Sequence, residues 1–173
     1  NVYFGGTPMD TIADIVKYQD TPGENYAFVS SGGDINGDGH LEYIVGAPWF
    51  NSSTGKVYIY DYRTRGETIS DLTMTGEGAE NYFGSAVSSA GDVNNDGYDD
   101  MIVGAPTYSS NRGRTYIYFG GAQLNNTPDI ILTGQTTNNY FGLSVSSAGD
   151  VNNDGYSDVI VGALWYNGGT GRA

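Results

Sequence analysis

The chain contains the same acidic motif three times at a fixed spacing. "GDINGDGHLE" begins at Gly33, "GDVNNDGYDD" at Gly91 and "GDVNNDGYSD" at Gly149, so each copy follows the previous one by 58 residues. A motif with this period indicates a repeat architecture, in which each unit buries its apolar surface against its neighbours. The role of the acidic motif is therefore needed once in every structural unit.

Segments on both sides of the acidic motif align in the same register. They are "NYAF", "NYFG" and "NYFG" from Asn25, Asn81 and Asn139, and "IVGAP", "IVGAP" and "IVGAL" from Ile44, Ile102 and Ile160. If the two chain ends are joined, "GRANVYFGG" matches "GRTYIYFGG" from Gly113. Successive "NY" tyrosines are then 56, 58 and 59 residues apart, which accounts for all 173 residues. The chain is three whole repeats, circularly permuted.

Each repeat contains four strand candidates, rich in β-branched and aromatic residues and separated by Gly, Asn and Ser turns. Four strands at this period predict a β-propeller blade, whereas a β-solenoid, the alternative, has a shorter repeat. We expect an all-β fold with three blades of four antiparallel strands, forming one half-propeller domain over residues 1–173. The expected parts are whole blades at 24–78 and 79–137, and a split blade with its first and second strands in 138–173 and its third and fourth in 1–23.

The acidic motif has the pattern of oxygen ligands found in calcium-binding loops. Side-chain oxygens recur at every second position, a glycine permits a sharp turn, and a backbone carbonyl and a final carboxylate follow. The expected ligands are Asp34, Asn36, Asp38, His40 and Glu42; Asp92, Asn94, Asp96, Tyr98 and Asp100; and Asp150, Asn152, Asp154, Tyr156 and Asp158. An Asp/Asn/Gly turn without metal is the alternative. Three carboxylates within nine residues repel one another without a cation, which favours about three Ca²⁺ ions per chain.

The motifs, in this order, resemble a known family. "NYFG", the D-x-N-x-D-G-x-x-D loop and "IVGAP" are similar to the FG-GAP repeat of integrin α-subunit heads and bacterial relatives, and the resemblance covers the whole chain. It implies a calcium-stabilised propeller, extracellular or of the cell envelope. Four residues depart from the pattern: Ala27 and Phe28 replace Phe-Gly, Leu164 replaces proline, and Glu42 replaces aspartate. Integrin heads have seven blades, so the resemblance does not carry receptor function to a three-blade chain.

Charge and motif content exclude several functions. Seven basic and twenty acidic residues give a net charge of −13, which disfavours nucleic acid and anionic membranes as partners. No apolar run approaches the ~18 residues of a membrane span. Cysteine is absent, the sole histidine, His40, belongs to a calcium loop, and no phosphate-binding glycine motif occurs. We therefore expect no enzymatic activity.

Aromatic residues follow the second strand of each repeat: Trp49, Phe50, Tyr108, Trp165 and Tyr166. Such side chains can stack on sugars or dock a peptide, but packing between blades is the interpretation we favour. The expected function is non-catalytic binding or adhesion, with a protein or glycan ligand. A carbohydrate-binding lectin on the same scaffold and an accessory domain of a larger extracellular enzyme remain as alternatives.

Three blades are fewer than the four of the smallest usual propeller. Unpaired strand edges readily recruit another chain. We therefore predict a homodimer joined head to tail, with six blades. In it, the C-terminal strand pair of each chain is completed by the N-terminal strand pair of the other.

Overall fold

A computed structural model describes residues 3, 12–13, 16, 23, 25–61 and 71–173 of the chain. The expected third and fourth strands of the split blade, in residues 1–23, lie almost wholly outside the described residues. No helix in the described part is long and apolar enough to cross a membrane.

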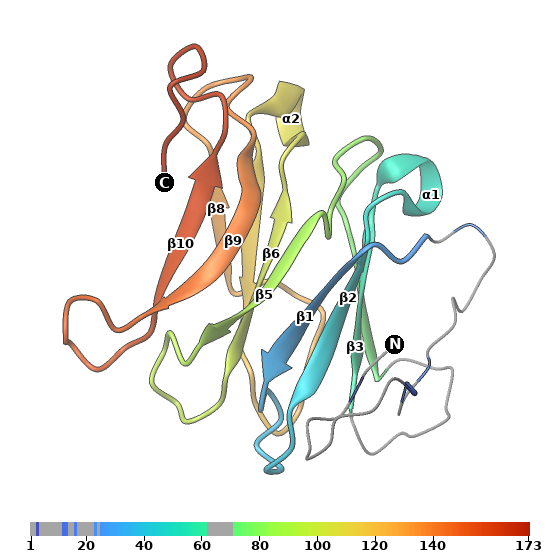
Figure 1. Cartoon of the computed structure of the whole chain (residues 1–173), viewed down its shortest axis with the longest axis vertical. Helices are drawn as coiled ribbons and strands as arrows, with labels where there is room; N and C mark the ends of the chain where they lie inside the picture. The colour runs from blue at the N-terminus through green and yellow to red at the C-terminus, as the bar shows by residue number, and fades with distance from the viewer. Residues whose placement is uncertain (1–2, 4–11, 14–15, 17–22, 24, 62–70) are drawn as a thin grey trace.

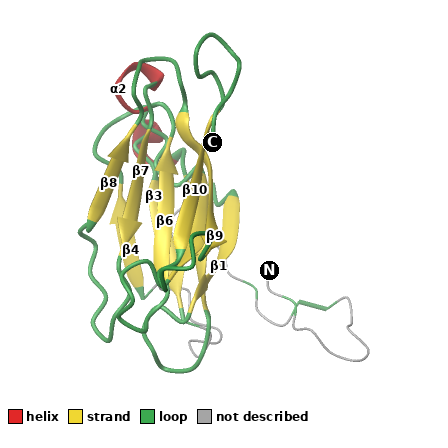
Figure 2. Cartoon of the chain, turned by 90° about the vertical axis from the view of Figure 1, so that its left-hand side faces the viewer, coloured by secondary structure: helices red, strands yellow, loops and turns green. Residues whose placement is uncertain are grey.

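The described part consists of three antiparallel sheets whose strands follow chain order (Figures 1 and 2). The first sheet holds β1 (Phe28–Gly33), β2 (Glu42–Ala47), β3 (Lys56–Tyr60) and β4 (Leu72–Thr75); the second β5 (Ala86–Gly91), β6 (Asp100–Ala105), β7 (Arg114–Tyr118) and β8 (Ile130–Thr133); the third β9 (Phe141–Gly149) and β10 (Asp158–Ala163). Two short turns, α1 (Phe50–Ser53) and α2 (Tyr108–Asn111), join second to third strands. The prediction of an all-β fold with four-stranded antiparallel blades is confirmed.

The main core lies between the first and second sheets. Its buried cluster joins residues of both, including Ile44, Val57 and Ile59 from the first sheet and Met101 and Val103 from the second. Four consecutive residues of β3, from Val57 to Tyr60, are buried, because both faces of this strand are covered. This burial on both faces explains the nearly continuous apolar runs "VYIY" and "TYIY", which would be alternating in a sheet with one wet face.

Glycines allow the sheets to approach closely. A Cβ at Gly46 would lie 2.0 Å from the carbonyl oxygen of Gly84 in the next sheet, and a Cβ at Gly104 would lie 2.0 Å from that of Gly142. Gly84 and Gly142 both have φ 87°, which favours glycine. The "VGA" glycine of one blade and the "FG" glycine of the next therefore form one repeated contact between blades.

The third sheet begins a third strand. Ala163 and Arg172 exchange two backbone hydrogen bonds, of 2.7 and 3.0 Å. The corresponding pairs in the other sheets are Ala47 with Lys56 and Ala105 with Arg114, where β3 and β7 begin. Beyond the pair at Ala163, no third strand lies along β10 among the described residues.

Candidate calcium loops

The three acidic loops lie at one end of the molecule. Residues 34–41, 92–99 and 150–157 each join the first and second strands of a sheet, at the lower end in Figure 1. The turns α1 and α2 and the segment 164–171 lie at the opposite end. Three equivalent segments, far apart in the sequence, are thus brought to the same end of neighbouring blades.

A bulge precedes each loop. The register of β5 against β6 shifts between Ser89 and Gly91, and Gly91 (φ 71°) donates its N–H to the Ser89 hydroxyl at 3.1 Å. Gly33 and Gly149 make the same bond to the serine two residues before them. Bulges of this kind bend the end of a strand and so redirect the loop that extends from it. The serines were not among the site residues predicted from the sequence, although "SS" recurs there in every repeat.

The side-chain oxygens of each loop converge on the loop's own amides. Asp92 Oδ1 and Asn94 Oδ1 both accept the Asp96 N–H, at 3.1 and 3.0 Å, and Asp92 Oδ2 accepts the Gly97 N–H at 2.9 Å. Asp96 Oδ1 accepts the Tyr98 N–H at 3.0 Å. The oxygens of the first, third and fifth loop positions are thereby held close together, as a calcium site requires.

The first and third loops repeat this network. Asp38 N–H donates to Asp34 Oδ1 and Asn36 Oδ1 at 3.0 and 2.9 Å, and His40 N–H donates to Asp38 at 2.9 Å. In the third loop, the donors are Asp154 to Asp150 and Asn152, at 3.1 and 2.9 Å, and Tyr156 to Asp154, at 3.0 Å. The fourth position is left-handed in every loop, as Gly37, Asn95 and Asn153. The same geometry therefore forms despite differences at the intervening residues.

The final carboxylate of the second loop is fully buried. Asp100, 0 % exposed, accepts the Val93 N–H at 2.8 Å and the Gly120 N–H at 2.8 Å, one on each oxygen. Burial raises the pKa of Asp100 to about 6, against the lowering effect of these two donors. A cation bound beside it would favour the ionised form. Asp100 is not part of a group of three acidic side chains within 4.8 Å of one another, which among the described residues occurs only as Asp38, Glu42 and Asp61.

The first loop contains an additional carboxylate that was not predicted from the sequence. Oxygens of Asp38, Glu42 and Asp61 lie within 4.8 Å of one another, and both Glu42 and Asp61 are buried. Burial raises the pKa of Glu42 to about 7. Asp61 directly follows β3, where the second repeat has Phe119, so an alignment of the repeats shows a lone acid at this position. The first loop therefore combines a longer final carboxylate with one extra negative charge.

The third loop is the most exposed. Asp158 accepts the Val151 N–H at 2.9 Å, as Asp100 accepts that of Val93. No described residue donates to the other oxygen of Asp158, whereas Gly120 does so for Asp100. Backbone donors, Gly155 first among them, lower the pKa of Asp150. Shared amide donors bring Asp150, Asn152 and Asp154 together, while a group of three acidic side chains within 4.8 Å of one another occurs, among the described residues, at the first loop only.

The aromatic residues after the second strands divide into two groups. Phe50 packs against the cluster around Val45, and Tyr108 packs against the main core with the Arg114 guanidinium 3.7 Å from its ring centre. Trp49 and Trp165 are exposed. Packing between blades therefore holds for Tyr108, whereas Phe50 packs within its own blade and the two tryptophans are exposed.

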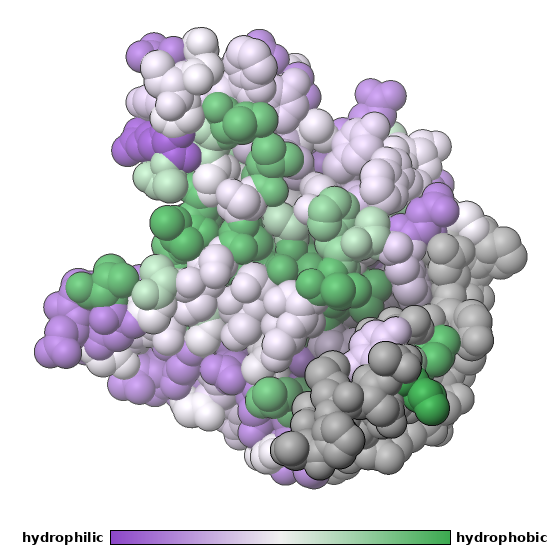
Figure 3. Space-filling view, in the orientation of Figure 1, coloured by the Kyte–Doolittle hydropathy of each residue, from purple (hydrophilic) through white to green (hydrophobic). Residues whose placement is uncertain are grey.

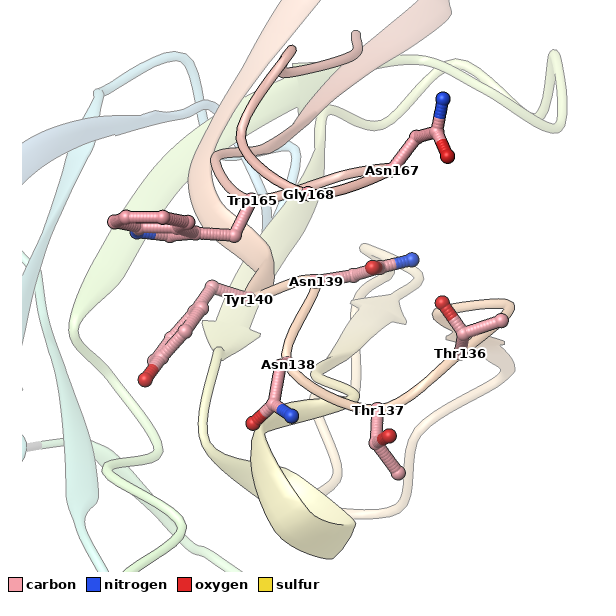
Figure 4. A pocket seen from close by; sticks show the side chains of 8 residues that line it. All are labelled: Thr136, Thr137, Asn138, Asn139, Tyr140, Trp165, Asn167 and Gly168. Atoms are coloured by element: carbon pink, nitrogen blue, oxygen red, sulfur yellow. The ribbon is translucent and has the colours of Figure 1, made fainter.

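Trp165 borders a pocket of about 420 Å³ at the end opposite the acidic loops. Its lining residues are Thr136, Thr137, Asn138, Asn139, Tyr140, Trp165, Asn167 and Gly168. Figure 4 shows the rings of Trp165 and Tyr140 on one side of the pocket, and the amide and hydroxyl groups on the other. The lining contains no charged side chain. A neutral ligand with one apolar face and several hydroxyl groups would match this surface.

Antiparallel four-stranded blades, each with an acidic loop between its first and second strands, define a repeat protein of the β-propeller class. The chain belongs to the FG-GAP repeat family, whose repeat matches residues 26–60, 83–118 and 141–173. This confirms the resemblance seen in the sequence.

Its relatives include integrin α subunits. The chain is 41 % identical to integrin alpha-6 of Gallus gallus over 76 % of its length and 36 % identical to integrin alpha-5 of Xenopus laevis over 76 %. It is 32 % identical to integrin alpha-8 of Gallus gallus over 98 % of its length. The match covers 13 %, 13 % and 18 % of these proteins, so the chain spans less than a fifth of their length.

Proposed function

We propose that this chain is a calcium-binding propeller module that acts by non-catalytic binding or adhesion and assembles head to tail with a second copy. The observation that carries the calcium proposal is the same network of converging oxygens in all three loops, of which the first differs in sequence from the other two. Similarity to integrin α subunits supports an adhesion role in an extracellular or cell-envelope setting. Millimolar extracellular calcium would fill even weak sites there.

In this proposal, the fifteen loop residues predicted from the sequence hold about three Ca²⁺ ions, one per loop. Each ion would bind the converging loop oxygens and neutralise the final carboxylate. Since each loop joins the first and second strands of a blade, the ion would cross-link those strands near their shared end. The role of calcium is structural, and Asp61 would add charge to the first site only.

Isothermal titration of the calcium-free protein tests the metal assignment. We expect about three binding events, and Asp92→Asn should remove or weaken one of them, because the first ligand of that loop loses its charge. Glu80→Gln is the matched control, because it removes one negative charge from an exposed side chain outside the loops. Titrations of the two variants with the same stoichiometry and affinities would refute the assignment.

A lectin function is the second candidate, and the neutral pocket at Trp165 favours it. Exposed aromatic rings stack on the apolar faces of sugars, while amides and hydroxyls bind the sugar hydroxyls. A glycan array should show binding that Trp165→Ala abolishes and that Trp49→Ala, at the equivalent position of the first blade, leaves unchanged. An array without any binding would remove this candidate.

A further inference from the structure

We propose that the pocket beside Trp165 binds a short uncharged saccharide and that the buried amide of Asn139 is its hydrogen-bonding anchor. The proposal rests on the lectin candidate above and gives it a ligand class and an anchor residue. All residues that line the pocket belong to the described part of the chain. The features that support it are an amide without a partner, a wall fixed by the neighbouring blade, an open indole ring and a lining without charge.

The Asn139 side chain is a buried polar group in the lining. Asn139 is 3 % exposed, and no described residue forms a hydrogen bond with its side chain, although its carbonyl oxygen accepts the Trp165 N–H at 3.3 Å. Figure 4 shows this side chain between Asn167 and Thr136. Buried polar side chains are nearly always hydrogen-bonded, and an unpaired one destabilises the fold. A sugar hydroxyl, which both donates and accepts, would supply the missing partner.

The wall that carries Asn139 is fixed by the second blade. Asn138 N–H donates to the Ser110 carbonyl oxygen at 3.1 Å, and Tyr140 N–H donates to that of Asn111 at 2.8 Å. Asn111 Nδ2 also donates to Asn138 Oδ1, at 3.3 Å. The turn α2 therefore holds both neighbours of Asn139 in place before a ligand arrives. A group held in its binding position loses little conformational entropy when the ligand binds.

Trp165 provides an open aromatic surface. Trp49, at the equivalent position of the first blade, stacks on Phe28 with 6.4 Å between the ring centres, whereas the third blade has the small Ser144 at the strand position of Phe28. Trp49 is 46 % exposed although the second blade packs beside its own, so exposure at this position does not require a missing neighbour. Trp165 is 54 % exposed and lies among apolar side chains on the face seen in Figure 3. Its ring is therefore available to the C–H face of a sugar.

The lining of the pocket differs from the equivalent surface of the second blade. The scaffold is shared, because Glu80 N–H donates to the Ser52 carbonyl oxygen at 3.0 Å, in the equivalent of the Asn138 bond. The aligned lining residues are Gly78, Ala79, Glu80 and Thr107 in the second blade, and Thr136, Thr137, Asn138 and Trp165 in the third. In the second blade, the Thr107 hydroxyl donates to the Glu80 carbonyl oxygen and so joins the two walls. The third blade instead presents hydroxyl groups, an amide and an indole ring.

Charge sets the class of saccharide. The lining contains no charged side chain, and the protein as a whole carries a net charge of −13. An anionic sugar would be repelled by this charge and would find no basic side chain in the lining to bind its carboxylate. The lining also offers no carboxylate to a bridging Ca²⁺ ion. The pocket therefore suits an uncharged saccharide that is bound by direct hydrogen bonds.

Isothermal titration with matched neutral and anionic sugars tests the ligand class. The neutral probes are the methyl glycosides of galactose, glucose and mannose, and each is paired with the methyl glycoside of its uronic acid, which differs by one carboxylate. We expect at least one neutral glycoside to bind, and its uronic acid partner to bind at least about tenfold more weakly. Binding of the uronic acid as tight as that of its neutral partner would overturn the ligand class.

Asn139→Leu tests the anchor, and Asn81→Leu, at the aligned position of the second blade, is the matched control. Asn139→Leu should weaken binding of the neutral glycoside at least about tenfold, because a ligand hydroxyl loses its buried partner, and the control should leave the affinity unchanged. Asn139→Leu should not lower the urea midpoint, because the amide that it removes has no protein partner. A lower midpoint together with lost binding would show a structural role and overturn the anchor.

Trp165 fluorescence gives a readout that needs no change at Asn139. The chain has two tryptophans, so Trp49→Phe leaves Trp165 as the sole indole. Its emission should shift to shorter wavelength when the glycoside displaces water from the ring. Binding without a change in emission would place the ligand elsewhere and overturn the proposal, even if Asn139→Leu fails to fold.

The outcomes separate this site from the functions proposed above. Glycoside binding that survives both Asn139→Leu and Trp165→Ala would overturn the site and leave the lectin candidate standing. No binding of any neutral glycoside would overturn the proposal, and a glycan array without binding would remove the lectin candidate as well. The calcium titration concerns the opposite end of the molecule, so its result is independent of both.

Discussion

Asp100 ties three parts of the second blade together. Its side chain belongs to β6, yet its two oxygens bond to Val93 in the acidic loop and to Gly120 beyond β7. The carboxylate is fully buried. A buried acceptor with two donors aimed at it cannot be replaced by a group that presents a donor without leaving an N–H unsatisfied.

Asp100→Asn should therefore destabilise the fold by about 1–3 kcal/mol, because the amide NH₂ would face one of the two backbone donors. The loss should be larger in calcium if the second loop binds it, since the wild type gains stability there and the variant gains less. Chemical denaturation with and without calcium measures both quantities, and Glu80→Gln serves as the charge-matched control. A variant as stable as the wild type would contradict the structural role of this carboxylate.

Glu42→Asp should tighten calcium binding at the first loop. Glu42 is one methylene longer than the aspartates at the equivalent positions, and calcium tolerates this at a cost in geometry. The extra negative charge of Asp61 favours calcium binding and so acts against this cost. We therefore expect the native first loop to bind calcium more weakly than the other two loops but not to lose binding. Calorimetric titration of the two proteins provides the comparison, and unchanged affinity at every site would refute the geometric argument.

At the scale of elements, strand burial depends on the neighbouring blade. The third strands β3 and β7 are buried on both faces because they lie within the stack of sheets. The stacking is close because glycines meet between sheets: Gly46 faces Gly84, and Gly104 faces Gly142. A blade is therefore an incomplete folding unit, and its stability depends on contact with the next blade, as in other repeat proteins.

Gly104→Ala should separate the second and third sheets. Its Cβ would overlap the Gly142 carbonyl, which is backbone and cannot rotate away, so we expect a loss of at least about 1–3 kcal/mol. Gly78→Ala is the control, because its Cβ would approach nothing closer than 3.6 Å. Thermal unfolding measures the difference between them. Equal midpoints for the two variants would show that the sheets do not pack as closely as described.

At the scale of the whole molecule, charge and shape are both uneven. The net charge is −13, and all three acidic loops lie at one end of the stack. Mutual repulsion at that end destabilises the compact state, and bound cations would relieve it. The opposite end carries the neutral pocket, and within the described part of the chain β10 has a third-strand partner only at Ala163.

Removal of calcium should lower the melting temperature of the intact protein. Each ion that binds only the folded state adds about 2.7 kcal/mol at a hundredfold excess over its Kd. Thermal melts in millimolar calcium and in EDTA, followed by circular dichroism, provide the measurement, with magnesium as the control for general charge screening. The same midpoint in calcium and EDTA would exclude a stabilising role for the metal.

The sequence by itself determined the features that are local or periodic. The repeat period specified three equivalent units, the β-branched and aromatic runs specified the strands, and the alternating Asp and Asn oxygens specified the loops. The strands and loops depend on residues close together in the chain, and the repeat is visible as the same motif recurring at a fixed spacing. The oxygen network of residues 92–98, for example, forms within seven consecutive residues, so it can be predicted from the sequence.

Tertiary structure decided the contacts between distant segments. Asp61 approaches Glu42, Gly120 reaches Asp100, Gly104 meets Gly142, and Trp165 shares a pocket with Tyr140 only because strands pair and sheets stack in one particular register. These distances cannot be predicted from composition and spacing, because the distances depend on how neighbouring sheets stack. The exposed edge of β10 is the clearest case: the sequence of β10 resembles β6, yet Ile160 is in solvent where Ile102 is buried, because no described strand pairs along that edge.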